Sequence, residues 1–275
     1  MIKRILLALQ FHTIVPVKVS GEVTERDLAR SAPFFPLAGA LQGLLLAAAS
    51  LALADAFGPN IGGGLSLAVL IIASGGFDLD GLADTADALA VKTSGDPEAC
   101  RQKRLDIMKE STVGAMGVIA IVVSILLKFL LISGALASGY APGRRWLVFA
   151  LLFAMPAFSK WITLPAMYHG QPAREDGLGR IFIGNTGFRE VACSTFLLAG
   201  IWLVAFYPAL YLKDVSLTGC IEFFLFPLVF FYALGVLGVK FFAKKFGGLT
   251  GDHLGALTEL AEALFLLIAV FRLRH

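Results

Sequence analysis

Long apolar stretches alternate with short polar segments along almost the whole chain. A helix that spans a bilayer needs about 20 mostly apolar residues, and seven stretches approach or exceed this length: residues 34–56, 61–77, 113–138, 146–168, 191–212, 219–240 and 255–271. The second is short and rich in glycine, so six spanning helices plus one re-entrant segment are the alternative to about seven transmembrane helices. The pattern predicts an all-α, polytopic integral membrane bundle, with residues 1–275 forming a single membrane-embedded catalytic domain.

The composition supports this prediction and excludes other classes of protein. Hydrophobic residues make up 57% of the chain and charged residues only 16%, whereas soluble domains carry about 25% charged residues. The deficit excludes a disordered chain and an ordinary soluble enzyme. The formal net charge of +3 is too small to indicate a nucleic acid as partner, so the expected surrounding is a lipid bilayer.

The basic residues indicate how the chain is oriented. Lys and Arg concentrate before the first apolar stretch and in three further segments, 78–112, 169–190 and 240–254. Cytoplasmic segments carry an excess of Lys and Arg. These four regions are therefore expected in the cytoplasm and the C-terminus outside, provided that all seven stretches span. The expected location is the cell (inner) membrane, with an active site that faces the cytoplasm.

The first 17 residues form a separate amphipathic segment. Ile2, Ile5, Leu6 and Leu9 fall on one helical face, whereas polar residues interrupt the apolar run that a secretion signal needs. The segment is therefore predicted to be an interfacial helix on the cytoplasmic surface, ending near Pro16.

Four aspartates crowd the segment after the second apolar stretch: Asp78, Asp80, Asp84 and Asp87. On a helix, the last three share one face, where like charges repel each other. Each Asp at a bilayer centre costs roughly 2.5–3.5 kcal/mol, so the cluster is expected at the cytoplasmic end of the second helix or in a wet cavity. Mg²⁺ takes oxygen ligands and often keeps substrate phosphates in its shell. The cluster predicts a magnesium site, and a solvated acidic helix end is the alternative.

Polar residues on the same side suit a phosphate. Arg104, Lys109 and Ser111 come shortly before a helix start that contains glycines, where backbone N–H groups bind anions; anchoring by positive charge is the alternative. Farther along the chain, Arg174 and Arg180 are candidates to clamp a diphosphate, and a plain polar loop is the alternative.

Two further acids complete the candidate set. Asp252 and Glu259 are seven residues apart, so they are expected to share a helix face with the other acids. Glu259 and Glu262 lie in an apolar context, where an ionisable side chain is a functional candidate. The residues alone thus point to a membrane enzyme whose cytoplasmic face uses aspartate-held Mg²⁺ to handle a diphosphate.

Five motifs follow one another along the chain: LQFHTIVPV at 9–17, FPLAG at 35–39, DGLADTAD at 80–87, IMKES at 107–111 with Gly114, and GGLTGDHLG at 247–255 with Glu259. In sequence and order they resemble the motifs of the cobalamin synthase family, also called adenosylcobinamide-GDP ribazoletransferases. The resemblance covers nearly the whole chain and is more specific than any single motif. Asp78 is a departure, since the family often has His at that position.

The resemblance implies the last assembly step of the cobalamin nucleotide loop. The substrates would be adenosylcobinamide-GDP and α-ribazole or its 5′-phosphate. A ribose hydroxyl takes over the corrinoid phosphate and GMP leaves, giving adenosylcobalamin or its 5′-phosphate.

The resemblance also implies roles for individual residues. Asp80, Asp84 and Asp87 would hold Mg²⁺, with Asp78 as a candidate fourth ligand, and Asp84 or Asp87 would accept the proton of the attacking hydroxyl. Arg104 and Lys109 would neutralise the GDP end, and Asp252 with Glu259 would complete the metal or ribazole pocket. A homo-oligomer, or an association with other enzymes of the cobalamin pathway, is the expected partner arrangement.

Three rival classes are weighed against this prediction. CDP-alcohol phosphotransferases also use Asp-Gly and later Asp residues, but they have Arg at the position of Asp84. A UbiA-like prenyltransferase has two Asp-rich motifs, whereas this chain has one dense motif. A cation or corrinoid transporter would use intramembrane acids, and no inverted repeat is visible in the sequence.

Overall fold

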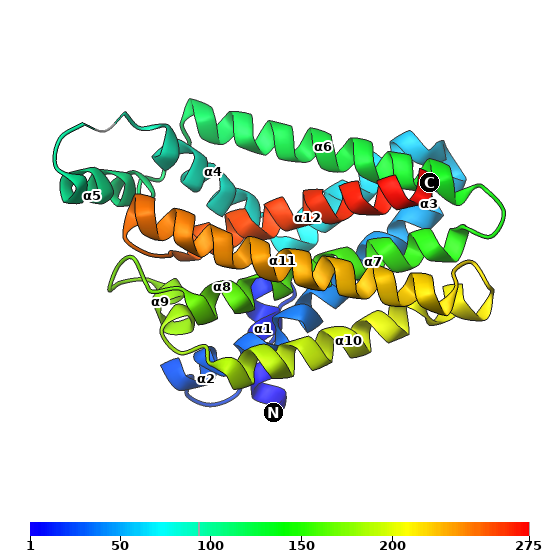
Figure 1. Cartoon of the computed structure of the whole chain (residues 1–275), viewed down its shortest axis with the longest axis horizontal. Helices are drawn as coiled ribbons and strands as arrows, with labels where there is room; N and C mark the ends of the chain where they lie inside the picture. The colour runs from blue at the N-terminus through cyan, green and yellow to red at the C-terminus, as the bar shows by residue number, and fades with distance from the viewer. Residues whose placement is uncertain (93, 275) are drawn as a thin grey trace.

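Helices make up the regular structure of the computed structural model, which describes residues 1–92 and 94–274 (Figure 1). No strand forms within these residues, and a single isolated bridge joins Pro172 to Leu249. The all-α prediction is thereby confirmed. The elements in chain order are α1 (Ile2–His12), α2 (Glu25–Ala29), the 3₁₀ turn η1 (Ala32–Phe34), α3 (Phe35–Ser74), α4 (Phe77–Ala90), α5 (Pro97–Ile107), α6 (Ala115–Gly139), α7 (Arg145–Trp161), α8 (Thr163–His169), α9 (Leu178–Ile183), α10 (Phe188–Tyr211), α11 (Leu217–Phe246) and α12 (Gly251–Arg274).

Six helical stretches in the described residues are long and apolar enough to cross a membrane. They run over Glu25–Ser74, Ala115–Gly139, Arg145–His169, Phe188–Tyr211, Leu217–Phe246 and Gly251–Arg274. The prediction of a polytopic membrane bundle is therefore confirmed, and the last five predicted spans fall in the last five of these stretches.

The first stretch folds back on itself inside α3. Gly58 has φ +82°, a left-handed conformation that only glycine adopts without strain, and Pro59 cannot donate the next helical hydrogen bond. Beyond the fold, Gly62 lies so close to Ala54 that a Cβ on it would come within 2.5 Å of the Ala54 nitrogen. The helices predicted over 34–56 and 61–77 are thus the two arms of α3.

Both arms of α3 return to the end of α1. In the first arm, the side-chain amide of Gln42 donates to the His12 carbonyl at 2.6 Å. In the second arm, the Ala73 carbonyl accepts from the Ile14 nitrogen at 3.0 Å. α1 ends at His12, short of Pro16 where the sequence placed its end, and it buries Leu7, Ala8 and His12 against the bundle.

A break at Gly75 and Gly76 separates the second arm from α4. Both glycines are left-handed, with φ +70° and +71°, so the helix cannot continue through them. α4 starts again at Phe77 and packs against α6 and α12 (Figure 1). The aspartate cluster therefore lies on a short helix of its own and not on the end of a continuous spanning helix.

The centre of the bundle is the α7–α8 stretch. Of its most apolar window, 89% is buried inside the protein, against 22% for α6 and for α11, so those two helices turn most of their surface outward. α3 packs closely on α7, because Gly39 and Gly43 lie against the backbone carbonyls of Pro156 and Phe153. Small residues four apart allow this approach between membrane helices.

The close contact between α3 and α7 predicts a large effect of a single methyl group. Gly43→Ala would add a Cβ that overlaps the Phe153 carbonyl oxygen. α3 must then shift away from α7, which costs about 1–3 kcal/mol of stability. Thermal unfolding in detergent should show a lower midpoint for this variant. Gly200→Ala is the matched control, because nothing lies within 4 Å of a Cβ there. Equal midpoints for the two variants would contradict the packing described.

Candidate functional site

A cavity of about 430 Å³, here called the site cavity, opens between α1, α4, α9 and α12. One part of its wall is charged, and the residues there are Asp78, Asp80, Arg174, Asp176, Arg180 and Asp252. Another part is aromatic, formed by Phe11, His12, Phe35, Phe77 and Phe182. Five of the candidate site residues therefore meet at one cavity: Asp78, Asp80, Arg174, Arg180 and Asp252.

Glycine contacts bring the two acidic motifs together across α4 and α12. A Cβ on Gly81 would lie 2.7 Å from the Asp252 carbonyl oxygen, and one on Gly255 would lie 3.2 Å from the Asp78 Cα. Only glycine permits this approach of the two backbones. The motifs at 80–87 and 247–255, far apart in sequence, therefore face the same space.

This arrangement disfavours the ionised form of Asp84. Burial, together with the neighbouring carboxylates of Asp80, Asp252 and Asp87, raises its pKa to about 6 against the opposing effect of Arg174. The positive charge of Arg174 does not balance the negative charges of the surrounding aspartates. Such an excess of negative charge is relieved when a divalent cation binds.

Asp87 is held by the start of α6. Its carboxylate accepts from the Gly114 nitrogen at 2.6 Å and from the Gly117 nitrogen at 2.8 Å. A Cβ on Gly114 would lie 2.5 Å from this carboxylate, which explains the glycine there. The helix start that was expected to bind a phosphate thus binds Asp87, a negative charge well placed at a helix N-terminus.

The basic candidates are distributed over the rim of the cavity. Arg174 pairs with Asp252 at 2.9 Å, and Lys109 pairs with Asp176 at 2.8 Å, an interaction that lowers the pKa of the Asp176 carboxyl. Arg180 lines the cavity but pairs with Glu25 at 3.0 Å. Lys109 therefore ties the segment before α6 to the loop that carries Arg174.

The other six candidates do not line the cavity wall: Asp84, Asp87, Arg104, Lys109, Ser111 and Glu259. Arg104 donates to the Lys245 carbonyl at 3.2 Å, where α5 meets α11. Ser111 is exposed on the segment between α5 and α6. Neither residue is among those that line the site cavity.

Glu259 does not line the site cavity, where it was expected to complete the pocket together with Asp252. Its carboxylate pairs with Lys128 at 2.8 Å and accepts from Ser124 at 2.6 Å. Lys128 also pairs with Glu262 at 2.9 Å. All three charged side chains are buried between α6 and α12, because an unpaired charge in that apolar interior would be costly.

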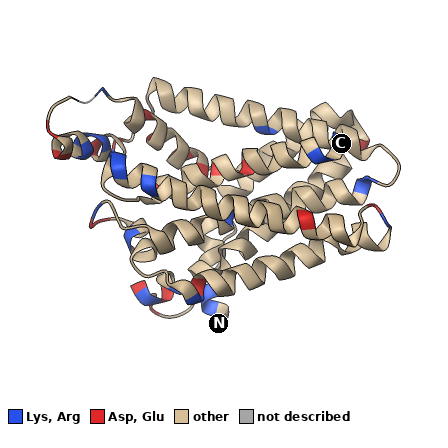
Figure 2. Ribbon diagram, viewed as in Figure 1, with Lys and Arg blue, Asp and Glu red and all other residues tan. Residues whose placement is uncertain are grey.

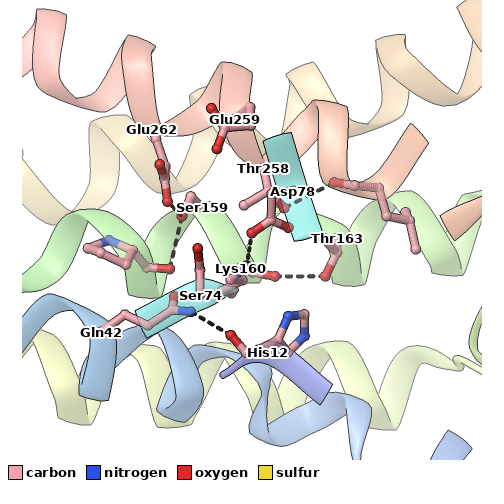
Figure 3. Close-up of polar contacts among 12 residues, drawn as sticks. His12, Gln42, Ser74, Asp78, Ser159, Lys160, Thr163, Thr258, Glu259 and Glu262 are labelled. Atoms are coloured by element: carbon pink, nitrogen blue, oxygen red, sulfur yellow. Dashed lines mark hydrogen bonds and ion pairs between the residues drawn. The ribbon is translucent and has the colours of Figure 1, made fainter. Parts of the chain in front are cut away.

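Asp78 is engaged in a second buried ion pair, with Lys160 of α7 (Figure 3). The Lys160 side chain is only 1% exposed, so it does not extend to the membrane surface. The sequence marks Lys160 as an intramembrane charge, but it carries no signal for its partner. Ser159, beside it, contacts Glu262 at 3.5 Å, so a line of polar groups runs from the cavity into the bundle (Figure 3).

The described residues contain no group of three or more His, Cys, Asp or Glu side chains that could hold a metal ion. Asp78 and Asp87 already have partners, so a cage of four aspartates is not assembled. Asp80 and Asp84 remain beside Asp252. Mg²⁺ is commonly bound by one or two carboxylates together with substrate phosphates, and the uncompensated charge around Asp84 fits that mode.

Comparison with known proteins adds an independent finding. A family model described as cobalamin-5-phosphate synthase matches residues 4–270. Relatives named adenosylcobinamide-GDP ribazoletransferase include one from Thermodesulfovibrio yellowstonii, 37% identical over 97% of this chain and 95% of its own. Others come from Geotalea daltonii, at 34% identity over 98% of both chains, and from Escherichia coli, at 33% over 94% and 96%. No solved structure matches the chain.

The buried Lys128 predicts a severe loss of stability when its charge is removed. Lys128→Met leaves two buried carboxylates without their cation, which costs about 3–5 kcal/mol. Unfolding in detergent should occur at a clearly lower temperature. Lys103→Met, at an exposed position on α5, is the control and should melt like the wild type. An unchanged Lys128→Met midpoint would show that the ion pairs contribute little.

Asp84 predicts a pH-dependent effect on stability. Its pKa is about 6 in the folded protein and 3.8 ordinarily, so its ionisation lowers the free energy of unfolding as pH rises through this range. Asp84→Asn removes that penalty. In EDTA, the variant should melt above the wild type at pH 8, and the difference should vanish near pH 4. A difference that does not depend on pH would refute this assignment.

Proposed function

Because the chain belongs to the cobalamin-5-phosphate synthase family, we propose that it acts as an adenosylcobinamide-GDP ribazoletransferase. In this reaction the adenosylcobinamide-phosphate group moves from adenosylcobinamide-GDP to α-ribazole or its 5′-phosphate. GMP is released, and adenosylcobalamin or its 5′-phosphate forms. The relatives' shared name supports the transfer, since they match over nearly their full length.

One observation carries the proposal at the level of residues. Asp80 of the 80–87 motif meets Asp252 of the 247–255 motif at a cavity that also contains Arg174. Asp84 is close enough to Asp80 and Asp252 for their charges to raise its pKa. Acids alone repel a diphosphate, and an arginine alone does not recruit a metal. Both together, in one partly enclosed space, suit a diphosphate bound with a divalent cation.

Asp80 and Asp84 are the residues that would hold Mg²⁺, with oxygens of the substrate diphosphate completing its shell. When bound, the ion would neutralise negative charge on the diphosphate. Asp78 and Asp87 would support the site without holding the ion: Asp78 is fixed by Lys160, and Asp87 fixes the start of α6. This division assigns two metal ligands, fewer than the four aspartates that the sequence suggested.

The transfer requires one proton acceptor. An oxygen of the ribose hydroxyl bonds to the phosphorus next to the corrinoid, the bond from that phosphorus to the bridging oxygen breaks, and GMP leaves with the bonding electrons. Asp84 would accept the hydroxyl proton, because a general base must lie within hydrogen-bond reach of the attacking hydroxyl and this carboxylate lies beside the proposed ion site. Arg174 would turn from Asp252 to the leaving phosphate. Lys109 would help to neutralise the GDP end at the rim of the cavity.

The location of the reaction follows from the charges. Lys and Arg gather on α5 and on the neighbouring end of α11, the end of the bundle that also holds the site cavity (Figure 2). The excess of positive charge supports a cytoplasmic site in the cell membrane. Corrinoid and ribazole are the small-molecule partners of this proposal, and the bilayer is its surrounding.

GMP release from the purified protein in liposomes tests the proposal. With Mg²⁺, adenosylcobinamide-GDP and α-ribazole, the wild type should release GMP, and EDTA should abolish the release. Asp84→Asn should reduce turnover at least 100-fold with normal insertion, because it removes both a ligand and the base.

Asp106→Asn is the matched control, since Asp106 is an exposed acid on α5 that contacts Gln102. It should retain normal turnover. Release that is insensitive to chelation would refute the metal assignment. No release from any variant or from the wild type would refute the transferase and favour a transporter.

A further inference from the structure

The aromatic part of the site cavity is a surface that the proposed transfer chemistry does not use. Four of its five rings cluster together: Phe11 and His12, with Phe35 and Phe182 buried behind them at 2% and 1% exposure. Their centroids are close, with 5.1 Å between Phe11 and Phe182, 5.3 Å between Phe35 and Phe182, and 4.3 Å between His12 and Phe35. The charged wall lies in the same cavity, so a ligand with a charged end and a flat apolar end can meet both.

His12 adds a polar group that has no partner. The residue is 8% exposed and lines the cavity, and its Nε2 has no hydrogen-bond partner among the described residues. Burial, with a smaller effect of the nearby Lys160, keeps the pKa of His12 well below its ordinary value. The ring is therefore neutral at pH 7, with one nitrogen as donor and the other as acceptor. Figure 3 shows the imidazole turned toward Thr163, which also lines the cavity.

Contacts with α3 hold the end of α1 in place beside the cavity. Gln42 binds the His12 carbonyl and Ala73 binds the Ile14 nitrogen, so both arms of α3 fix the last turn of the helix. The N-terminal motif therefore reaches the cavity, although its sequence suggested only an interfacial helix. Rings fixed in this way lose little freedom when they bind a flat ligand.

The volume of the cavity and the polarity of its wall restrict which ligands it can bind. A volume of about 430 Å³ is at the low end for sites that enclose small molecules, so it suits one nucleoside and not a whole corrinoid nucleotide. Guanine presents several donors and acceptors, whereas the aromatic wall offers one unpartnered nitrogen. Buried polar groups without partners are costly, so a fused ring without polar substituents fits better.

We propose that Phe11 and His12, backed by the buried rings of Phe35 and Phe182, form the subsite for the flat heteroaromatic base of the acceptor nucleoside, with His12 hydrogen-bonding a ring nitrogen or the adjoining ribose. This inference rests on the proposed function and adds to it the position of the acceptor. α1 is then a specificity element. Aromatic faces bind a fused ring by stacking.

Binding of two nucleosides without phosphate separates this subsite from the charged wall. The probes are α-ribazole and guanosine, titrated in detergent onto the full chain. We expect α-ribazole to bind the wild type at least 10-fold more tightly than guanosine. His12→Ala and Phe11→Leu should each weaken α-ribazole binding at least fivefold. Phe241→Leu, at an exposed ring on α11 outside the cavity, should change nothing.

Kinetics provide the second readout. The same two variants should raise the KM for α-ribazole at least fivefold, with kcat and the KM for adenosylcobinamide-GDP within twofold of the wild type. His12→Asn, which keeps a hydrogen-bonding group, should recover part of the loss. Asp84→Asn should still bind α-ribazole although turnover is lost, so failure of the transfer mechanism and failure of this subsite are distinguishable.

Two outcomes would overturn the proposal. One is normal α-ribazole binding by both His12→Ala and Phe11→Leu. The other is a loss of guanosine binding alone, which would assign the rings to the leaving nucleotide. Size-exclusion profiles identify a variant that fails to fold, and the second variant then decides.

Discussion

Charges inside this bundle must be neutralised where they lie, and that constraint sets the positions of its helices. Lys160 joins α7 to α4 through Asp78, and Lys128 joins α6 to α12 through Glu259 and Glu262. In an apolar interior a lone ammonium or carboxylate is unfavourable by several kcal/mol, so each pair holds its helices in one register. α4 depends on this most, because only left-handed glycines connect it to α3.

The site differs from the interior in its charge balance. Each buried charge has an oppositely charged partner, whereas the acids at the cavity exceed the cations beside them: after burial, the charges of Asp80, Asp252 and Asp87 are what raises the pKa of Asp84. Imbalance in a cleft is typical of a functional site. α12 carries both arrangements: Asp252 at its start faces the cavity, and Glu259, two turns on, faces Lys128. One helix thereby links the site to the buried ion pairs.

The sequence was sufficient for the fold class and for part of the site. Apolar stretches of spanning length predicted the helices, and the spacing of the aspartates placed them near one another on α4. The partner of Glu259 was not predicted, because a seven-residue spacing does not fix which neighbouring helix a side chain meets. The partners of Lys160 and of Asp87 could not be predicted either, because they depend on contacts between segments that are distant in the sequence. The role of α1 was missed because amphipathicity reports a buried face but not what covers it.

The double glycine before α4 has a mechanical consequence. A continuous helix transmits tilt along its length, and a spanning helix tilts when the bilayer around it changes thickness. At Gly75 and Gly76 that transmission stops, because two left-handed residues interrupt the helix. The acids of α4 are then positioned by contacts with α6 and α12 and by the ion pair between Asp78 and Lys160 of α7. A change in the tilt of α3 is in this way not passed along a continuous helix to these acids.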